Sequence, residues 1–230
     1  MTPQKLQIIQ EADQWLAVAK PAGLSTEGLH QGYDTAESLL RGMRPDIRFL
    51  ALPHRLDRPT SGLLLVAKSK SALRHLNQCL AKGLTSKHYL AITQPADLPK
   101  AATLIHYHRK DARHRRAILR EKTTAGFREA RLWYRRLRST PDQHHLLQVR
   151  LFTGRYHQIR VQLAAVGTPV YNDQHYGAEK HLAEPMIGLH AWRLSFPEPG
   201  SLKQVQLQLP IPDNACWPEE WRKKTLQELP

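Results

Sequence analysis

The stretch HRLDRPTSGLLLVAKS, residues 54–69, joins a cluster of charged side chains to a short apolar run. The run at 62–68 has the length and continuity of a fully buried strand. Asp57 precedes this run, with Arg55 and Arg58 close on either side. A lone carboxylate at this place is either a structural counter-ion or a reactive group that its neighbours keep ionised. The second reading requires a cationic partner that is fixed by the fold.

Arginine suits this partner role, because it stays protonated and can bind both oxygens of a carboxylate. Adjacent residues on an extended segment point in opposite directions, so Arg58 need not be the partner of Asp57. Arg155 lies at the turn into a predicted helix at 156–166, which Gly167 ends. A residue at a rigid helix start is well placed to meet Asp57 from a distant part of the chain. Arg155 is therefore our candidate partner.

Outward from the opening stretch, apolar periodicity predicts about eight strands and three or four helices. The expected strands are 6–9, 15–19, 62–68, 88–93, 130–138, 145–152, 186–196 and 205–209. The expected helices are one capped by Asp34 with Glu37, one from Ser69 to Gly83, one at 156–166 and one beginning at Pro218. No regular βαβ alternation is present. The pattern predicts an α+β fold with a large mixed or mostly antiparallel sheet and flanking helices, in a single domain of residues 1–230. If two lobes exist, the chain is expected to cross between them near 96–130.

The chain is strongly basic, with 34 Lys and Arg against 20 Asp and Glu, a formal net charge of +14. Such an excess favours an anionic partner, most often nucleic acid. Residues 106–138 contain twelve of the basic residues and three acids, interleaved with Tyr107, Phe127, Trp133 and Tyr134. Arginine makes bidentate phosphate contacts, and aromatic rings can stack on bases. This segment is the first candidate for RNA contact, and a solvated basic hairpin is the alternative.

Several classes of function have no support in the sequence. There is no GxxxxGK[ST], GxGxxG or HExxH motif, so neither a nucleotide cofactor nor a metal is predicted. Cys79 and Cys216 are far apart and have no metal-ligand spacing. No signal-peptide pattern is present, and the longest apolar runs are too short to span a bilayer. A cytoplasmic protein is the expectation.

The opening stretch resembles the signature of the RluA-type pseudouridine synthases, in which HRLD carries the catalytic aspartate. Five further segments resemble motifs of this family and follow in its order. They are VAKPAGL (18–24), SKHYLA (86–91), LFTGRYHQIRVQLAAVGTPV (151–170), NDQHYG (172–177) and LHAWRLSFPEP (189–199). Ala19, Gln162 and Asn172 depart from the usual residues, and none of the three is at a presumed chemical position.

The resemblance implies a pseudouridine synthase fold with a central basic cleft, and the isomerisation of uridine to pseudouridine within RNA. Asp57 is implied as the nucleophile, or as the base that opens the glycosidic step. Arg155 is implied to hold Asp57 ionised. Tyr89 is implied to stack on the uracil, and it could remove the proton from C5.

The resemblance also implies contacts to an extruded nucleotide and to RNA phosphate. The residues expected at these contacts are His54, Arg55, Arg58, Thr60, Arg109, Arg113, Arg115, Arg116, His157 and Arg160. No cofactor or metal is needed, since substrate and product are isomers. The expected partner is tRNA or large-subunit ribosomal RNA, and the expected state is a monomer. The chain is expected to lack the S4-like domain of many relatives. The segment HRLDRPTSG, the short N-terminus and the basic segment favour the tRNA-modifying branch of the family.

Two other functions stay open at this point. The first is an inactive RNA-binding protein with the same fold, which an intact Asp57, Tyr89 and Arg155 argue against. The second is a hydrolytic enzyme that acts on a nucleoside or glycoside. Such an enzyme usually needs a second carboxylate, for which Asp173 is the candidate.

Overall fold

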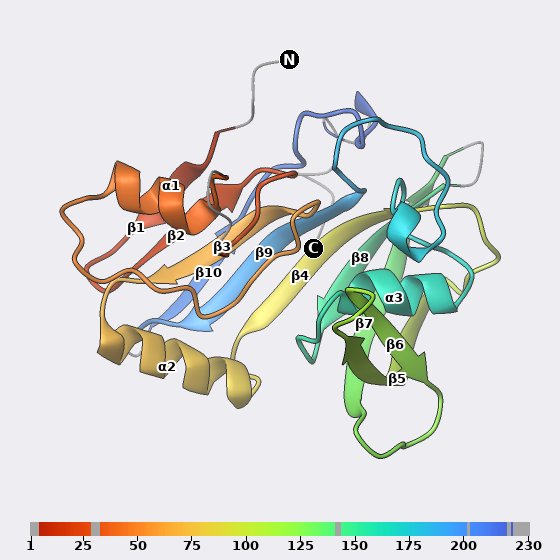
Figure 1. Cartoon of the computed structure of the whole chain (residues 1–230), viewed down its shortest axis with the longest axis horizontal. Helices are drawn as coiled ribbons and strands as arrows, with labels where there is room; N and C mark the ends of the chain where they lie inside the picture. Colours follow the sequence, from red (N-terminus) through yellow and green to blue (C-terminus); the bar gives the residue numbers. More distant parts are fainter. Residues whose placement is uncertain (1–4, 29–32, 141–143, 202, 220–221, 223–230) are drawn as a thin grey trace. The chain divides into compact units, whose positions relative to one another are not determined.

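The computed structural model in Figure 1 describes residues 5–28, 33–140, 144–201, 203–219 and 222. The chain divides into two compact units. Met1–Lys87 and His190–Pro212 belong to the first, and His88–Leu189 and Asp213–Lys224 to the second. Residues 96–130, where the sequence predicts a crossing between lobes, instead lie within the second unit. The chain passes from the first unit to the second directly after Lys87.

The strands of the first unit pair mainly with antiparallel neighbours. They are β1 (Gln7–Glu11), β2 (Trp15–Lys20), β3 (Ser61–Ala67), β9 (Leu189–Pro197) and β10 (Gln204–Gln208). Strand β2 lies between β1 and β3, and β10 pairs with the second half of β9. The exception is a short parallel contact of β3 with β9 at Ser61 and Gly62. Gly62 has a φ of 124°, and a β-carbon there would lie 2.3 Å from the carbonyl oxygen of Ala191. Only glycine allows the two strands to approach this closely.

Helix α2 (Lys70–Ala81) covers an apolar face of these strands (Figure 1). Its Leu76 packs in a buried cluster with Leu63, Leu65, Trp15 and Phe196, and the rings of Trp15 and Phe196 meet edge to face at 5.1 Å. The helix begins as predicted at Ser69, whose hydroxyl accepts a hydrogen bond from the Ala72 amide. This cluster fixes β3, and β3 in turn fixes the loop that precedes it.

Helix α1 (Ala36–Met43) begins one residue later than the sequence predicts. The predicted caps are Asp34 and Glu37, whereas the structure uses Thr35 and Ser38 in a reciprocal capping box. Thr35 has the extended backbone that a cap requires, and it pairs with Ser25 in an isolated bridge. That tertiary contact decides which residue becomes the cap.

The second unit contains β4 (Ser86–Thr93), β5 (Ala101–Asp111), β6 (Arg116–Arg120), β7 (Arg128–Ser139) and β8 (His145–Leu151). Their order is β4-β8-β7-β5-β6, and the pairs β8–β7, β7–β5 and β5–β6 are antiparallel. The sequence prediction missed β5 and β6, because their charged residues obscure the alternation of apolar side chains. The predicted terminal helix after Pro218 falls mostly outside the described residues.

Helix α3 (Gln158–Ala165) lies against one face of this sheet, followed by the short helix η1 (Gln174–Tyr176) (Figure 1). Val161 of α3 packs with Ala117 of β6 and Tyr176 of η1. Gln162 donates hydrogen bonds from Nε2 to the carbonyl oxygens of Leu104 and Ala130. The fold is therefore α+β, as predicted, and most strand pairs are antiparallel. No helix in the described part of the chain is long and apolar enough to cross a membrane.

Candidate active site

Asp57 lies half-buried in the loop that leads into β3, in the first unit. The backbone is fixed on both sides of it. Thr26 donates from Oγ1 to the carbonyl oxygen of Leu56 at 2.6 Å and accepts from the Leu56 amide at 3.1 Å. The Thr60 amide donates to the carbonyl oxygen of Asp57 at 3.0 Å. The loop therefore holds the carboxylate in a preset position, as a reactive group requires.

Lys20, at the end of β2, connects the turn that follows β2 to the Asp57 loop. Its side chain is buried, and Nζ donates to the carbonyl oxygens of Pro21 at 2.8 Å and Leu24 at 2.7 Å, with a longer bond to that of Arg58 at 3.4 Å. Burial lowers the pKa of Lys20 to about 7, and the negative charge of Asp57 acts in the opposite direction. In the sequence this residue appears within the segment VAKPAGL (18–24), with no role assigned to its side chain. Its buried amine is a positioning group for the Asp57 loop.

We expect Lys20→Met to flatten the pH dependence of the protein's stability. The ordinary pKa of lysine is 10.5 and that of folded Lys20 is about 7. Between these values the unfolded chain binds more protons at this position, so the free-energy cost of burying this amine falls and the protein's stability rises as the pH rises from about 7. Urea unfolding at a series of pH values from about 6.5 to 9 should show this rise in the wild type and a flatter dependence in the variant. Parallel curves would contradict the assignment of a buried amine.

His54 anchors the loop to β3 and does not carry charge. Its Nε2 accepts a hydrogen bond from the Leu65 amide at 3.1 Å. Burial, together with the positive charge of Lys87, lowers the pKa of His54 to about 3, so the ring is neutral at physiological pH. The expected contact of His54 with phosphate therefore does not involve an ion pair.

The other expected RNA contacts of the first unit differ in exposure. Arg55 is exposed and pairs with Glu27 at 3.0 Å, an exposed ion pair that an RNA phosphate could replace. Arg58 is exposed as well and donates from Nε to the carbonyl oxygen of Gly23 at 2.9 Å. Thr60 is buried at the start of β3. Both arginines keep donors on the surface beside Asp57.

The two remaining expected catalytic residues belong to the second unit. Tyr89 lies in β4 and is 7% exposed. Arg155 lies in the turn before α3, where its Nε donates to the carbonyl oxygen of Glu129 at 3.0 Å. Gln158 accepts from the Arg155 amide at 2.9 Å and from Thr153 Oγ1 at 2.8 Å, which fixes this turn. Each residue is thus well held within its unit, and the meeting of Asp57 with Tyr89 and Arg155 stays a prediction.

The side chain of Arg160 is buried inside the second unit, whereas the family resemblance implies that it contacts RNA. Its Nε and Nη2 donate to the two carboxylate oxygens of Asp173 at 2.7 and 2.8 Å. The side chains are 5% and 2% exposed, so the pair is buried and bidentate. The sequence motif does not show which face of α3 is buried, so it could not predict that Arg160 points inward. Asp173 is likewise occupied as a counter-ion.

His157 is also engaged within the second unit. Its backbone has a left-handed φ of 53° at the start of α3, and its Nδ1 lies 2.9 Å from the hydroxyl of Tyr176. The same hydroxyl accepts from the Ala117 amide at 2.8 Å, so its own hydrogen can serve His157. Burial, reinforced by the positive charge of Arg160, lowers the pKa of His157 to about 3. A neutral His157 links α3 to β6 and η1.

The remaining expected RNA contacts are exposed arginines on and beside the β5–β6 hairpin. They are Arg109, Arg113, Arg115 and Arg116. Tyr156, next to Arg155, donates from its hydroxyl to the carbonyl oxygen of Arg115 at 3.0 Å. The ring of Tyr156 also lies 4.7 Å from Nζ of Lys110. The hairpin and the Arg155 turn are therefore tied together within the second unit.

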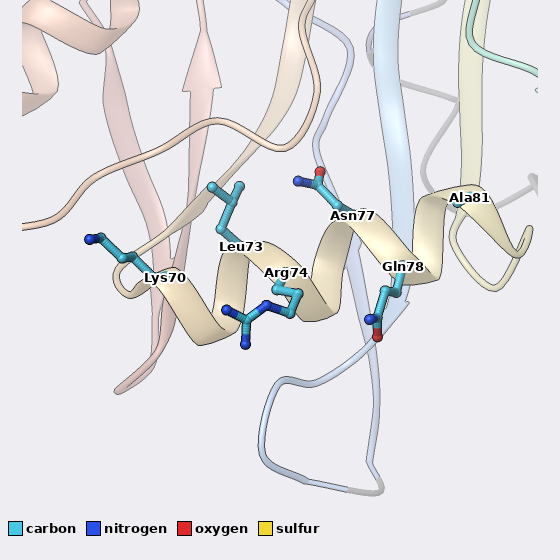
Figure 2. A pocket seen from close by; sticks show the side chains of 6 residues that line it. All are labelled: Lys70, Leu73, Arg74, Asn77, Gln78 and Ala81. Carbon is cyan, nitrogen blue, oxygen red and sulfur yellow. The ribbon is translucent and has the colours of Figure 1, made fainter.

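The described residues contain no cluster of three His, Cys, Asp or Glu that could hold a metal ion. Both cysteines are buried, and burial raises the pKa of Cys216 to about 12, so its thiol is not a nucleophile. A surface pocket along α2 is lined by Lys70, Leu73, Arg74, Asn77, Gln78 and Ala81 (Figure 2). It includes none of the expected site residues, and we assign it no part in the chemistry.

The site thus consists of a loop that is fixed by backbone hydrogen bonds and presents one carboxylate, in a basic α+β protein. Residues 14–165 match the family model for RNA pseudouridylate synthase. The chain belongs to this family, and the resemblance to its RluA-type members is confirmed.

Named relatives agree with this membership. The chain is 33% identical over 221 residues to the ribosomal large subunit pseudouridine synthase C of Vibrio cholerae, covering 89% of this chain and 65% of that protein. The protein of the same name from Escherichia coli is 31% identical over 239 residues, covering 96% and 69%. The chain thus spans about two thirds of the length of these curated relatives.

Solved structures support the fold. The structure of human RNA pseudouridylate synthase domain containing 1 has a TM-score of 0.76 and 25% identity, covering 94% of this chain and 91% of that chain. Human RNA pseudouridylate synthase domain containing 4 has a TM-score of 0.72 and 21% identity, covering 90% and 89%. The second likeness concerns the fold alone.

Proposed function

We propose that this protein is an RNA pseudouridine synthase that isomerises a uridine in structured RNA. The observation that carries the proposal is the Asp57 loop, because it combines the family's catalytic signature with a backbone fixed at Leu56 and Thr60. Exposed arginines beside Asp57 in the first unit and on the β5–β6 hairpin in the second unit each support an RNA substrate.

The proposed reaction begins when the carboxylate of Asp57 opens the bond between ribose C1′ and uracil N1, as a nucleophile or as a base. As a nucleophile, the carboxylate forms an ester bond to C1′ while the bond to N1 breaks; as a base, it takes a proton from the ribose and returns it later. The detached uracil rotates, and its C5 forms the new bond to C1′ while any ester bond between Asp57 and C1′ breaks. The proton on C5 then leaves to a base, for which Tyr89 is the candidate, and N1 gains a proton. Atoms and electrons balance without a co-reactant, since uridine and pseudouridine are isomers.

The other groups are proposed to position Asp57 or the RNA substrate. Arg155 is proposed to bind the carboxylate of Asp57 and to keep it ionised, and its guanidinium is already oriented by the Glu129 carbonyl. Lys20 adds a buried amine whose positive charge, when the amine is protonated, interacts with Asp57. Arg55 and Arg58 are proposed to meet the phosphates of the extruded nucleotide.

The RNA substrate is proposed to be large-subunit ribosomal RNA, because the relatives cited above are named for it. The segment HRLDRPTSG, the short N-terminus and the basic segment favour the tRNA-modifying branch, so tRNA is the second substrate to test. A hydrolytic enzyme is less well supported, because Asp173 is buried in its ion pair with Arg160.

The proposal is tested with RNA transcripts that carry tritium at C5 of uridine. The purified protein should release tritium to water and convert uridine to a nucleoside of the same mass, in ribosomal RNA before tRNA. Release of free uracil would support hydrolysis. RNA binding without tritium release would support the inactive RNA-binding alternative.

A further inference from the structure

We propose that the sheet face opposite α3 in the second unit binds the phosphate backbone of RNA, outside the nucleotide that reacts. This inference rests on the proposed action on RNA. The surface, which we call the arginine face, consists of Arg109, Arg120, Phe127, Arg131, Arg150 and Phe152.

The strand register places the four arginines on one side of the sheet. Directly opposed residues in antiparallel strands point to the same face. Tyr107 of β5 pairs with both Arg120 and Glu129, and Trp133 of β7 pairs with Arg150. Alternation then puts Arg109 and Arg131 on this same face.

The opposite face is the one that α3 covers. Ala117, Ala130 and Leu132 alternate with the arginines and are buried, and Ala117 packs against α3. The four arginines of the arginine face are exposed. Ile105, on the same side of β5 as Arg109, is 51% exposed. Within the second unit, this face is thus open to solvent.

On this face, two guanidinium groups lie over each of two aromatic rings. Arg109 and Arg120 lie over Phe127, at 4.8 and 6.0 Å from the ring centroid. Arg131 and Arg150 lie over Phe152 at 5.0 and 5.1 Å, and Phe152 is 41% exposed. Stacking on a ring restricts a guanidinium and leaves its N–H edge available. The four groups are therefore partly ordered before a ligand arrives, which lowers the entropic cost of binding.

Among the described residues, the charge on this face is only partly neutralised by nearby acids. Glu129 lies 3.8 Å from Arg131, a long contact between two side chains that are about half exposed. Asp111 already accepts a hydrogen bond from His114 at 2.7 Å. Four arginines that outnumber the nearby acids fit a polymer of phosphates, to which each guanidinium can bind through two N–H groups. RNA phosphate is the partner that this arrangement fits best.

The test measures the binding of a fluorescein-labelled RNA hairpin by anisotropy at several salt concentrations. Arg131→Gln with Arg150→Gln removes two guanidiniums. We expect the affinity to fall by about tenfold and the slope of log Kd against log salt to fall by about 2, since each phosphate contact contributes about 0.9. Phe152→Leu keeps both charges and should weaken binding by about two- to fivefold, because only the ring contact is lost.

The matched control is Lys70→Gln with Arg74→Gln, two exposed changes on α2 with the same loss of charge. It should leave the salt slope unchanged. An unchanged affinity in the arginine-face variant, or an equal loss in the control, would overturn the proposal. If polyglutamate binds the wild type as tightly as RNA and shows the same losses in the variants, the face is a surface for acidic proteins, and the proposal is again overturned.

Binding and chemistry are separated by a single-turnover assay. At saturating protein, the arginine-face variant should isomerise uridine at the wild-type rate, although half-saturation requires more protein. The binding experiment does not require turnover, so it stays informative if the proposed isomerase activity is absent. A lower rate at saturation would place these residues in the reaction and not in docking.

Discussion

Asp57→Asn is expected to abolish pseudouridine formation, with a loss of about 10⁴-fold or more in single-turnover rate. The amide has nearly the shape of the carboxylate but can neither attack C1′ nor act as a base. The loop around it should persist, because it is fixed by backbone bonds of Leu56 and Thr60. RNA affinity is therefore expected to remain close to that of the wild type. The assay is tritium release from C5-labelled RNA, with anisotropy for binding.

Asp46→Asn is a suitable control for this variant. Asp46 is an exposed carboxylate of the first unit that pairs with Arg44 at 2.7 Å, so the change in charge is the same. Its activity should equal that of the wild type. Substantial activity in Asp57→Asn and also in Asp57→Ala would contradict the proposed mechanism.

Asp173→Asn is expected to produce the largest loss of stability, about 3–5 kcal/mol in the free energy of unfolding. The variant removes the carboxylate charge that pairs with the buried guanidinium of Arg160, in a site where both side chains are almost fully enclosed. Urea unfolding of the full chain measures this loss. Glu179→Gln, which removes a highly exposed carboxylate from the same unit, should cost less than about 1 kcal/mol.

A second variant separates the lost charge from the lost packing. Arg160→Met with Asp173→Leu replaces the pair by apolar side chains of similar size and should recover most of the stability. A double variant as unstable as Asp173→Asn would contradict this account. If folded Asp173→Asn protein loses isomerisation entirely, Asp173 takes part in the chemistry and is more than a counter-ion.

All eight strands that the sequence predicts are present, since buried strands such as β3 carry an apolar signal that depends on local sequence alone. The Ser69 cap of α2 follows from local sequence in the same way. Strand β5 could not be predicted, because both of its faces mix polar and apolar residues: Ile105 lies on the arginine face, and His106 and His108 lie on the face that α3 covers. The short β6 is bounded by charged residues as well. The capping box at Thr35 depends on a bridge to Ser25, a contact that only the folded chain makes.

The sequence motif predicted which residues are candidates for the site. It could not predict the role of a residue where that role depends on how its side chain packs in the folded chain. The motif indicated Asp57 and Arg155, but it did not distinguish exposed Arg55 from Arg160, which α3 turns into the interior. The supporting groups Lys20 and Thr26 were missed as well. Thr26 acts through the backbone of Leu56, which is distant in the sequence, and Lys20 bonds to carbonyl oxygens on both sides of the contact between residues 21–24 and Arg58. A sequence pattern does not show such contacts.

The central claim is that the carboxylate of Asp57 converts uridine to pseudouridine in RNA. It is tested most directly by mapping pseudouridine in total RNA from cells that lack this gene and are complemented with the wild type or with Asp57→Asn. We predict that at least one position loses pseudouridine in the deletion, regains it with the wild type and stays uridine with the variant. Identical maps in all of these cells, or restoration by Asp57→Asn, would contradict the account.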